Sequence, residues 1–172
     1  MKWITRENVH VDRVACPWLI RRFVDPEAEF MFVPSEEVER LAKKEGAVPF
    51  DVTNAELGHH GDKCSFDAIV RKYGLKDEAL LDVATIVRAA DTDTFEIAPE
   101  SIGLEAISSG ATMITKDDCE TVEKSMFIYD ALYGYCRLRL LKEQHKAELD
   151  KMSRSERRLY LKDRLLTKDK DK

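Results

Sequence analysis

The first third of the chain alternates short apolar segments with segments of helical periodicity. The short segments lie at residues 3–5, 30–33 and 47–52, and between them apolar residues recur every three or four positions. Segments this short have the length of β-strands, and a helix that connects two neighbouring strands makes them parallel with a right-handed crossover. We therefore predict a small, mainly parallel sheet flanked by helices.

From Cys64 onward the pattern is helical. One apolar stripe ends at Gly74, a second runs up to Asp91, and a long helix is expected to begin near residues 116–118. Between Pro99 and Gly110 we expect a short helix at most. The predicted fold class is therefore α/β, with the sheet in the N-terminal third and a helical C-terminal half.

Charge divides the chain into two parts. Residues 1–136 contain 15 Lys and Arg against 26 Asp and Glu, a net charge of −11, whereas residues 137–172 contain 13 against 7, a net charge of +6. An acidic body repels nucleic acid and favours cations, so direct nucleic-acid binding is not expected. We predict one domain at residues 1–137 and a basic extension at 138–172, helical or partly disordered, whose end at 168–172 is frayed.

The compartment and the oligomeric state are expectations of the same kind. The longest apolar run, residues 14–20, is far below the roughly 20 residues that a membrane span needs, and the N-terminus has no hydrophobic signal segment. We expect a cytoplasmic protein with reduced cysteines and no membrane contact. Amphipathic stretches in residues 126–149 favour a homo-oligomer.

Two short segments hold three of the four histidines. His10 and Asp12 lie where a strand gives way to a helix, and residues two apart on an extended chain point to the same side. Ligands of open α/β sheets bind at this carboxyl end of the strands. The alternative is that Asp12 caps the helix beside an exposed His10.

The second segment, Glu56-Leu57-Gly58-His59-His60-Gly61, has two adjacent histidines flanked by glycines. Both cannot be core residues, and glycine permits the tight backbone that a ligand loop needs. The alternative is a solvated loop. Asp91 ends an apolar helix, where a carboxylate opposes the helix dipole, so a bound cation would be a favourable partner. The alternative there is a solvated turn.

These segments together predict a divalent-cation site. Imidazole and carboxylate ligands suit manganese, iron or zinc. The predicted metal ligands are His10, Asp12, Glu56, His59, His60 and Asp91.

Catalysis at such a site would need a group that accepts a proton and a group that holds an anion. We expect His59 or Glu56 to accept the proton from a metal-activated water, and Arg13 to hold a small oxyanion. Arg21 and Arg22 offer the same anion chemistry, but arginines on a helix more often pair with acids. Cys16 and Cys64 are read either as buried small residues or as thiolates, and Asp67 as a carboxylate that supports a histidine.

Long stretches of the sequence resemble a known family. WITRENVHVDRVACPWLIRRFVDPEAEFMFVP, PFDVTNAELGHHGDKCSFDAIVRKYGL and IVRAADTDTF are similar to the chromate-resistance ChrB domain family, over roughly residues 3–137. The resemblance implies a role in the response to chromate, regulatory or protective, with no settled reaction.

A second similarity concerns the order of the motifs. A strand that leads to His-x-Asp and, further on, a loop with paired histidines resemble DHH-type phosphoesterases, which place such ligands around manganese. The resemblance gives the corresponding roles to His10, Asp12, His59, His60 and Asp91. Gly58 stands where that family has an acidic residue before the histidine pair, so Glu56 or Asp51 would have to compensate.

Three hypotheses follow from these observations. The chain is a metal-dependent hydrolase, a non-enzymatic domain that responds to metal or chromate through a protein partner, or a structural domain without a functional metal. The charge of −11 on the body favours a cation site over direct capture of the chromate dianion.

Overall fold

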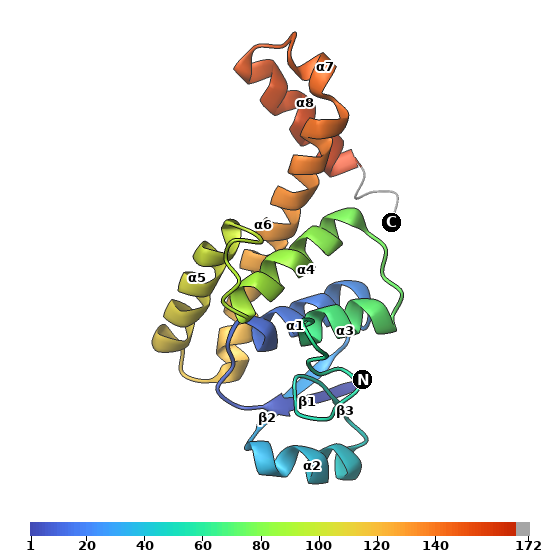
Figure 1. Ribbon diagram of the computed structural model, residues 1–172, viewed down its shortest axis with the longest axis vertical. Helices are drawn as coiled ribbons and strands as arrows, with labels where there is room; N and C mark the ends of the chain where they lie inside the picture. Colours follow the sequence, from blue (N-terminus) through green and yellow to red (C-terminus); the bar gives the residue numbers. More distant parts are fainter. Residues whose placement is uncertain (168–172) are drawn as a thin grey trace.

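The computed structural model describes residues 1–167 (Figure 1), so the predicted frayed end at 168–172 lies outside the described residues. The elements, in chain order, are β1 (Lys2–Arg6), α1 (Val11–Phe23), β2 (Glu29–Val33), the 3-10 helix η1 (Ser35–Glu37), α2 (Val38–Glu45), β3 (Val48–Pro49), α3 (Ser65–Lys72), α4 (Glu78–Asp91), α5 (Glu100–Ile114), α6 (Asp118–Gln144), α7 (Lys146–Leu149) and α8 (Arg154–Thr167).

The three strands form a parallel sheet in the order β2-β1-β3. Trp3 of β1 aligns with Phe30 of β2 and with Val48 of β3. The short α2 covers one face with a small apolar cluster around Ile4 and Val38, and α1 and α3 lie on the other side (Figure 1). The predicted fold class, a small parallel sheet followed by a helical half, is confirmed.

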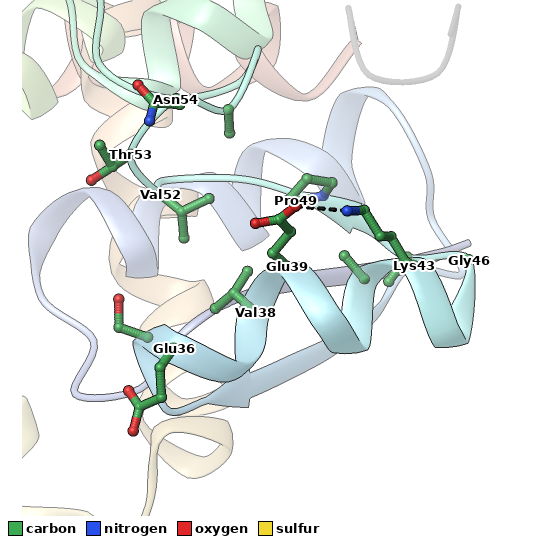
Figure 2. Close-up of a pocket in the computed structure, with 13 residues that line it drawn as sticks. Glu36, Val38, Glu39, Lys43, Gly46, Pro49, Val52, Thr53 and Asn54 are labelled. Atoms are coloured by element: carbon green, nitrogen blue, oxygen red, sulfur yellow. Dashed lines mark hydrogen bonds and ion pairs between the residues drawn. The ribbon is translucent and has the colours of Figure 1, made fainter.

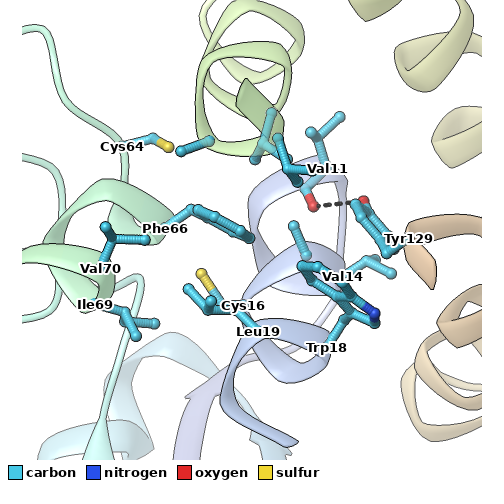
Figure 3. Close-up of a cluster of buried hydrophobic side chains, with 14 of the residues drawn as sticks. Val11, Val14, Cys16, Trp18, Leu19, Cys64, Phe66, Ile69, Val70 and Tyr129 are labelled. Carbon is cyan, nitrogen blue, oxygen red and sulfur yellow. Dashed lines mark hydrogen bonds between the residues drawn. The ribbon is translucent and has the colours of Figure 1, made fainter. Parts of the chain in front are cut away.

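The main core is centred on α1, of whose thirteen residues nine are buried. The Trp18 side chain is fully buried; its ring stacks on Phe66 of α3 at 6.3 Å and lies 6.0 Å from Tyr129 of α6. Figure 3 shows these three side chains converging from three helices. Because the indole N–H of Trp18 also donates to Asp130 at 2.8 Å, its one polar atom is satisfied.

The helical half differs from expectation in one element. α5 is a regular 15-residue helix, so the prediction of a short helix at most between Pro99 and Gly110 was wrong. Packing explains the difference, because Ser101, Leu104 and Ser108 are buried and tertiary contacts outweigh the low helix propensity of the glycines.

The 27-residue α6 continues past residue 137, and α7 and α8 fold back along its C-terminal part through Leu141, Leu149 and Leu161 (Figure 1). The predicted extension therefore begins inside a helix of the body. Within residues 1–167, no helix is both long enough and apolar enough to span a membrane.

The position of Trp18 makes it the sharpest test of this core. Trp18→Phe removes the hydrogen bond to Asp130 and leaves a void, so the free energy of unfolding should fall by about 2 kcal/mol. Urea denaturation measures the change. Leu159→Ala, at a side chain that is 70% exposed, is the control and should change stability by less than about 0.5 kcal/mol. Equal effects of the two substitutions would contradict the assigned core.

Candidate metal centre

Asp12 lies in the first turn of α1, yet its carboxylate accepts hydrogen bonds from the start of another helix, α3. Oδ2 accepts the backbone N–H of Ser65 at 2.7 Å and Oδ1 accepts that of Phe66 at 3.1 Å. These are the free N–H groups at the start of α3, where a carboxylate is favoured by the helix dipole. The alternative in which Asp12 caps its own helix does not hold, because His10 is the N-cap residue of α1. Asp12 is 1% exposed and joins α1 to α3.

His59 comes from the loop between β3 and α3, and Gly58 fixes its position. A Cβ at Gly58 would lie 2.7 Å from the carbonyl oxygen of Val52, so only glycine fits this turn. The His59 side chain is 45% exposed. Its Nε2 atom lies 3.5 Å from Oδ2 of Asp12 and 3.3 Å from Oδ2 of Asp91.

A third carboxylate, that of Asp51, completes the surroundings of His59. Asp51 Oδ1 lies 3.3 Å from His59 Nε2 and accepts the hydroxyl of Ser65 at 2.9 Å. The residue follows β3 with a left-handed backbone (φ of 48°) that turns the chain into the loop. Its other oxygen faces two cations, the guanidinium of Arg13 at 3.4 Å and that of Arg6 at 3.8 Å.

The three carboxylates strongly perturb the proton affinities of the site. The pKa of His59 is raised to about 9, first by its contact with Asp12 and then by the charges of Asp12, Asp51 and Asp91, although burial opposes the shift. Burial and the charge of Asp12 raise the pKa of Asp91 to about 6. The pKa of Asp51 is raised by the same two causes. Three carboxylates thus lie around a single imidazole in a partly buried site, which is a condition that favours a bound cation.

Distances decide what kind of cation the geometry suits. One ligand atom each from Asp12, His59 and Asp91 lies within 4.8 Å of the other two. Charge-assisted N–H···O hydrogen bonds are about 2.7–2.9 Å long, shorter than the 3.3–3.5 Å found around His59 Nε2. Metal–ligand bonds of about 2.0–2.2 Å place neighbouring ligand atoms about 3.0–3.5 Å apart. The donor set and its spacing therefore fit a divalent metal ion.

The other predicted ligands lie outside this group. His10 Nε2 is 3.1 Å from the hydroxyl of Ser109 on α5. His60 turns away from its neighbour His59, and its Nε2 is 2.9 Å from the carbonyl oxygen of Glu56. The Glu56 carboxylate is exposed and pairs with Lys72 at 2.6 Å. The structure thus brings together Asp12, His59 and Asp91, and places His10, His60 and Glu56 elsewhere.

Sequence comparison defines the family of this chain. The family model described as "ChrB, C-terminal domain" matches residues 3–136. The chain belongs to this family. Protein ChrB of Cupriavidus metallidurans is 35% identical over 135 residues, which cover 78% of this chain and 40% of the relative. The chain thus spans well under half the length of that relative. No solved structure matches the chain.

The matched region includes all four residues of the cluster, since Asp12, Asp51, His59 and Asp91 lie between residues 3 and 136. Asp51 was expected only as a substitute for a missing acidic residue. Its position identifies it, because it lies near the end of the third short segment, residues 47–52, and so at the carboxyl end of a strand.

The arginines expected to hold an anion are committed to the protein itself. Arg13 is 13% exposed, and its Nη2 atom donates to the carbonyl oxygen of Asn8 at 2.8 Å while Nη1 faces Asp51. Arg21 pairs with Glu123 at 2.5 Å, and Arg22 pairs with Asp130 at 2.7 Å. Arg13 therefore pairs with Asp51 and is not directed at an external anion.

The two cysteines near the site are buried thiols. Cys16 donates to Asp12 Oδ1 at 3.4 Å, and Cys64 lies at the start of α3. Burial, followed by the charge of Asp12, raises the pKa of both thiols above the ordinary value. Asp67, expected to support a histidine, instead pairs with Arg88 at 2.6 Å. The cysteines are therefore protonated and poor nucleophiles at neutral pH.

A separate cavity of about 780 Å³ lies between α2 and the loop at residues 52–55 (Figure 2). Its floor is apolar, with Val38, Pro49 and Val52, and Glu39 and Lys43 pair with each other at its rim. None of the carboxylates around His59 lines this cavity.

The raised pKa of His59 predicts a pH-dependent stability in the metal-free protein. A histidine whose pKa is about 9 in the folded state and about 6.5 in the unfolded state stabilises the fold below pH 6.5 and loses this effect as the pH rises to 9. After allowance for solvent screening, the loss should be about 1–2 kcal/mol. Urea denaturation in the presence of EDTA measures it.

The matched control for this prediction is the adjacent histidine. His60→Gln should keep the full decline between pH 6.5 and 9, whereas His59→Gln should lose more than half of it. The same pH profile in both variants would show that His59 does not carry this charge interaction.

Proposed function

We propose that this chain binds a divalent cation through Asp12, His59 and Asp91, with Asp51 beside them. The observation that carries the proposal is the convergence of three carboxylates on one imidazole nitrogen at 3.3–3.5 Å. A protonated His59 can balance only part of this charge, whereas a divalent cation would balance it and gain ligands already held in place by α1, α4 and the loop.

The ligand types narrow the choice of ion. Carboxylates with one imidazole suit manganese, iron or zinc. Soft ions such as copper(I) prefer thiolates, and the raised pKa values of Cys16 and Cys64 keep these neighbours protonated. The set is richer in oxygen than in nitrogen, so manganese and iron(II) should compete well with zinc.

Membership of the ChrB C-terminal domain family supports a role of this metal site in the response to chromate. We infer that the domain acts as a metal-responsive regulatory domain of the chromate-resistance system and works through a protein partner. Chromate is a dianion, and a body of charge −11 disfavours its direct capture. The arginines that would hold it are paired with Glu123, Asp130 and Asp51. The signal is therefore a cation, either a resident metal or reduced chromium.

A hydrolase of the phosphoesterase type is the second candidate, favoured by one observation. The His59 side chain is 45% exposed, so solvent reaches the cluster at its imidazole. A divalent cation lowers the pKa of a bound water toward neutrality. Asp51, whose pKa is raised, lies where it can accept a proton. Glu56, expected to do so, is engaged with Lys72, and Arg13 is not directed at a substrate. The regulatory role therefore fits the geometry better.

Metal binding can be tested with neighbouring histidines as matched variants. His59→Gln should raise the dissociation constant for manganese or zinc at least about a hundredfold, because one of three ligands is lost. His60→Gln and His10→Gln should bind as the wild type does. Isothermal titration calorimetry gives the constants, and inductively coupled plasma mass spectrometry of the tag-free protein identifies the ion.

Asp12→Asn is a poorer variant for this purpose because Asp12 also holds α3. Absence of binding in the wild type after reconstitution with manganese, iron and zinc would sink the metal site. Equal losses in the His59 and His60 variants would place the ion elsewhere in the loop.

The regulatory and hydrolytic roles differ in what a loaded site does. For the regulatory role we expect metal to raise the melting temperature by several degrees without hydrolysis of bis-p-nitrophenyl phosphate above the buffer rate. Hydrolysis that requires metal, disappears in His59→Gln and persists in His60→Gln would establish the hydrolase instead.

A further inference from the structure

The helix α5 has its apolar face turned outward. Its buried positions include Ser101 and Ser108. Its exposed positions are, without exception, apolar residues or glycines: Ile102, Gly103, Ala106, Ile107, Gly110, Met113 and Ile114. These seven residues, the outer face of α5, follow the spacing by which one helix packs against another. The pattern is the reverse of that expected for a helix whose outer side faces water.

The large side chains of this face are well exposed. Ile102 is 58% exposed, Ile107 49%, Met113 80% and Ile114 81%. In Figure 1, α5 lies at the outer edge of the helical layer, with no other element of residues 1–167 beyond it. A contiguous apolar surface of this kind on a folded protein marks a contact with another molecule.

The outer face of α5 also contains two glycines, Gly103 and Gly110, that no contact within residues 1–167 requires. Among the residues that the structure describes, nothing lies within 4 Å of a Cβ added at Gly103 or Gly110, and neither has a left-handed backbone. Glycine inside a helix weakens it relative to alanine, so nothing within the monomer accounts for these two. Glycines seven residues apart lie on one side of a helix, where they allow a second helix to approach closely.

We propose that the outer face of α5 binds a second copy of this chain. An antiparallel pair of α5 helices with its two-fold axis between Ala106 and Ile107 is self-complementary. Gly103 then lies opposite Gly110 of the partner subunit, and the large Ile107 lies opposite the small Ala106 of the partner subunit. An isologous dimer requires such a surface, in which every contact is made twice.

The net charge of the body also supports a second copy of this chain as the partner. A body with a net charge of −11 repels its own copies over most of its surface. The outer face of α5 has no charged residue; the one acid between Ser101 and Thr115, Glu105, lies beside His10 at 3.8 Å. This face is therefore one over which two acidic copies can meet without like charges in contact. The negative charge also disfavours an anionic membrane surface.

The outer face of α5 supplies a large part of the apolar area that a stable dimer needs. At about 150 Å² for a fully exposed large side chain, the exposed fractions of Ile102, Ile107, Met113 and Ile114 come to roughly 400 Å² of apolar surface per copy. A stable homodimer buries about 800 Å² per copy, of which about 65% is apolar.

Sedimentation velocity of the full chain over a wide range of concentration tests the proposal. The wild type should be a dimer, and Ile107→Glu should raise the dissociation constant at least about a hundredfold, because it brings two carboxylates together at the two-fold axis. Leu159→Glu, at a similarly exposed aliphatic residue on α8, should leave the dimer intact. A monomeric wild type, or a dimer that survives Ile107→Glu, overturns the proposal.

Gly110→Ala distinguishes a helix whose outer face is in solvent from a helix in close contact with a second helix. On a solvent-facing helix it strengthens the fold and leaves association unchanged. At a close helix contact it should raise the dissociation constant about tenfold, because the added methyl group keeps the helices apart. A wild-type monomer that floats with phosphatidylcholine vesicles, and no longer floats after Ile107→Glu, would assign the face to a lipid surface and overturn the dimer.

Discussion

A carboxylate buried as completely as that of Asp12 costs free energy unless donors or cations surround it. The protein supplies two backbone N–H groups from the start of α3 and the thiol of Cys16. These contacts fix α3 against α1, and the loop that carries His59 ends at this same point. The packing of Trp18 on Phe66 makes the junction rigid. The geometry of the candidate centre therefore follows from how one buried charge is accommodated.

Two further carboxylates lie beside Asp12, those of Asp91 at the end of α4 and of Asp51 after β3. Arg6 and Arg13 pair with Asp51 alone, whereas His59 contacts all three carboxylates, and this contact raises its pKa to about 9. A site with three converging ligand atoms and a solvent-exposed histidine is suited to take up a cation. For this member of the ChrB C-terminal domain family, we therefore propose a divalent cation as the ligand of the cluster.

Much of this could be predicted from the sequence, and the failures have physical causes. The parallel sheet follows from apolar segments joined by helices. Asp12 and Asp91 were named from their positions at element ends, and His59 from the histidine pair flanked by glycines. Alternation along a strand suggested that His10 would join Asp12, but α1 begins at Val11 and turns the two apart. His60 was grouped with His59, although adjacent side chains on an extended loop point in opposite directions. Sequence cannot show that Glu56 meets Lys72, since that contact depends on how the loop folds over α3.

The position of the bound ion tests the proposed metal centre most directly. Crystals grown with manganese and measured at a wavelength where its anomalous signal is strong would locate the ion independently of activity or affinity. We expect one peak at about 2.0–2.2 Å from an oxygen of Asp12, from Nε2 of His59 and from an oxygen of Asp91. A peak bound by His60 or His10, or no peak within this cluster in a crystal that contains manganese, would contradict the proposed metal centre.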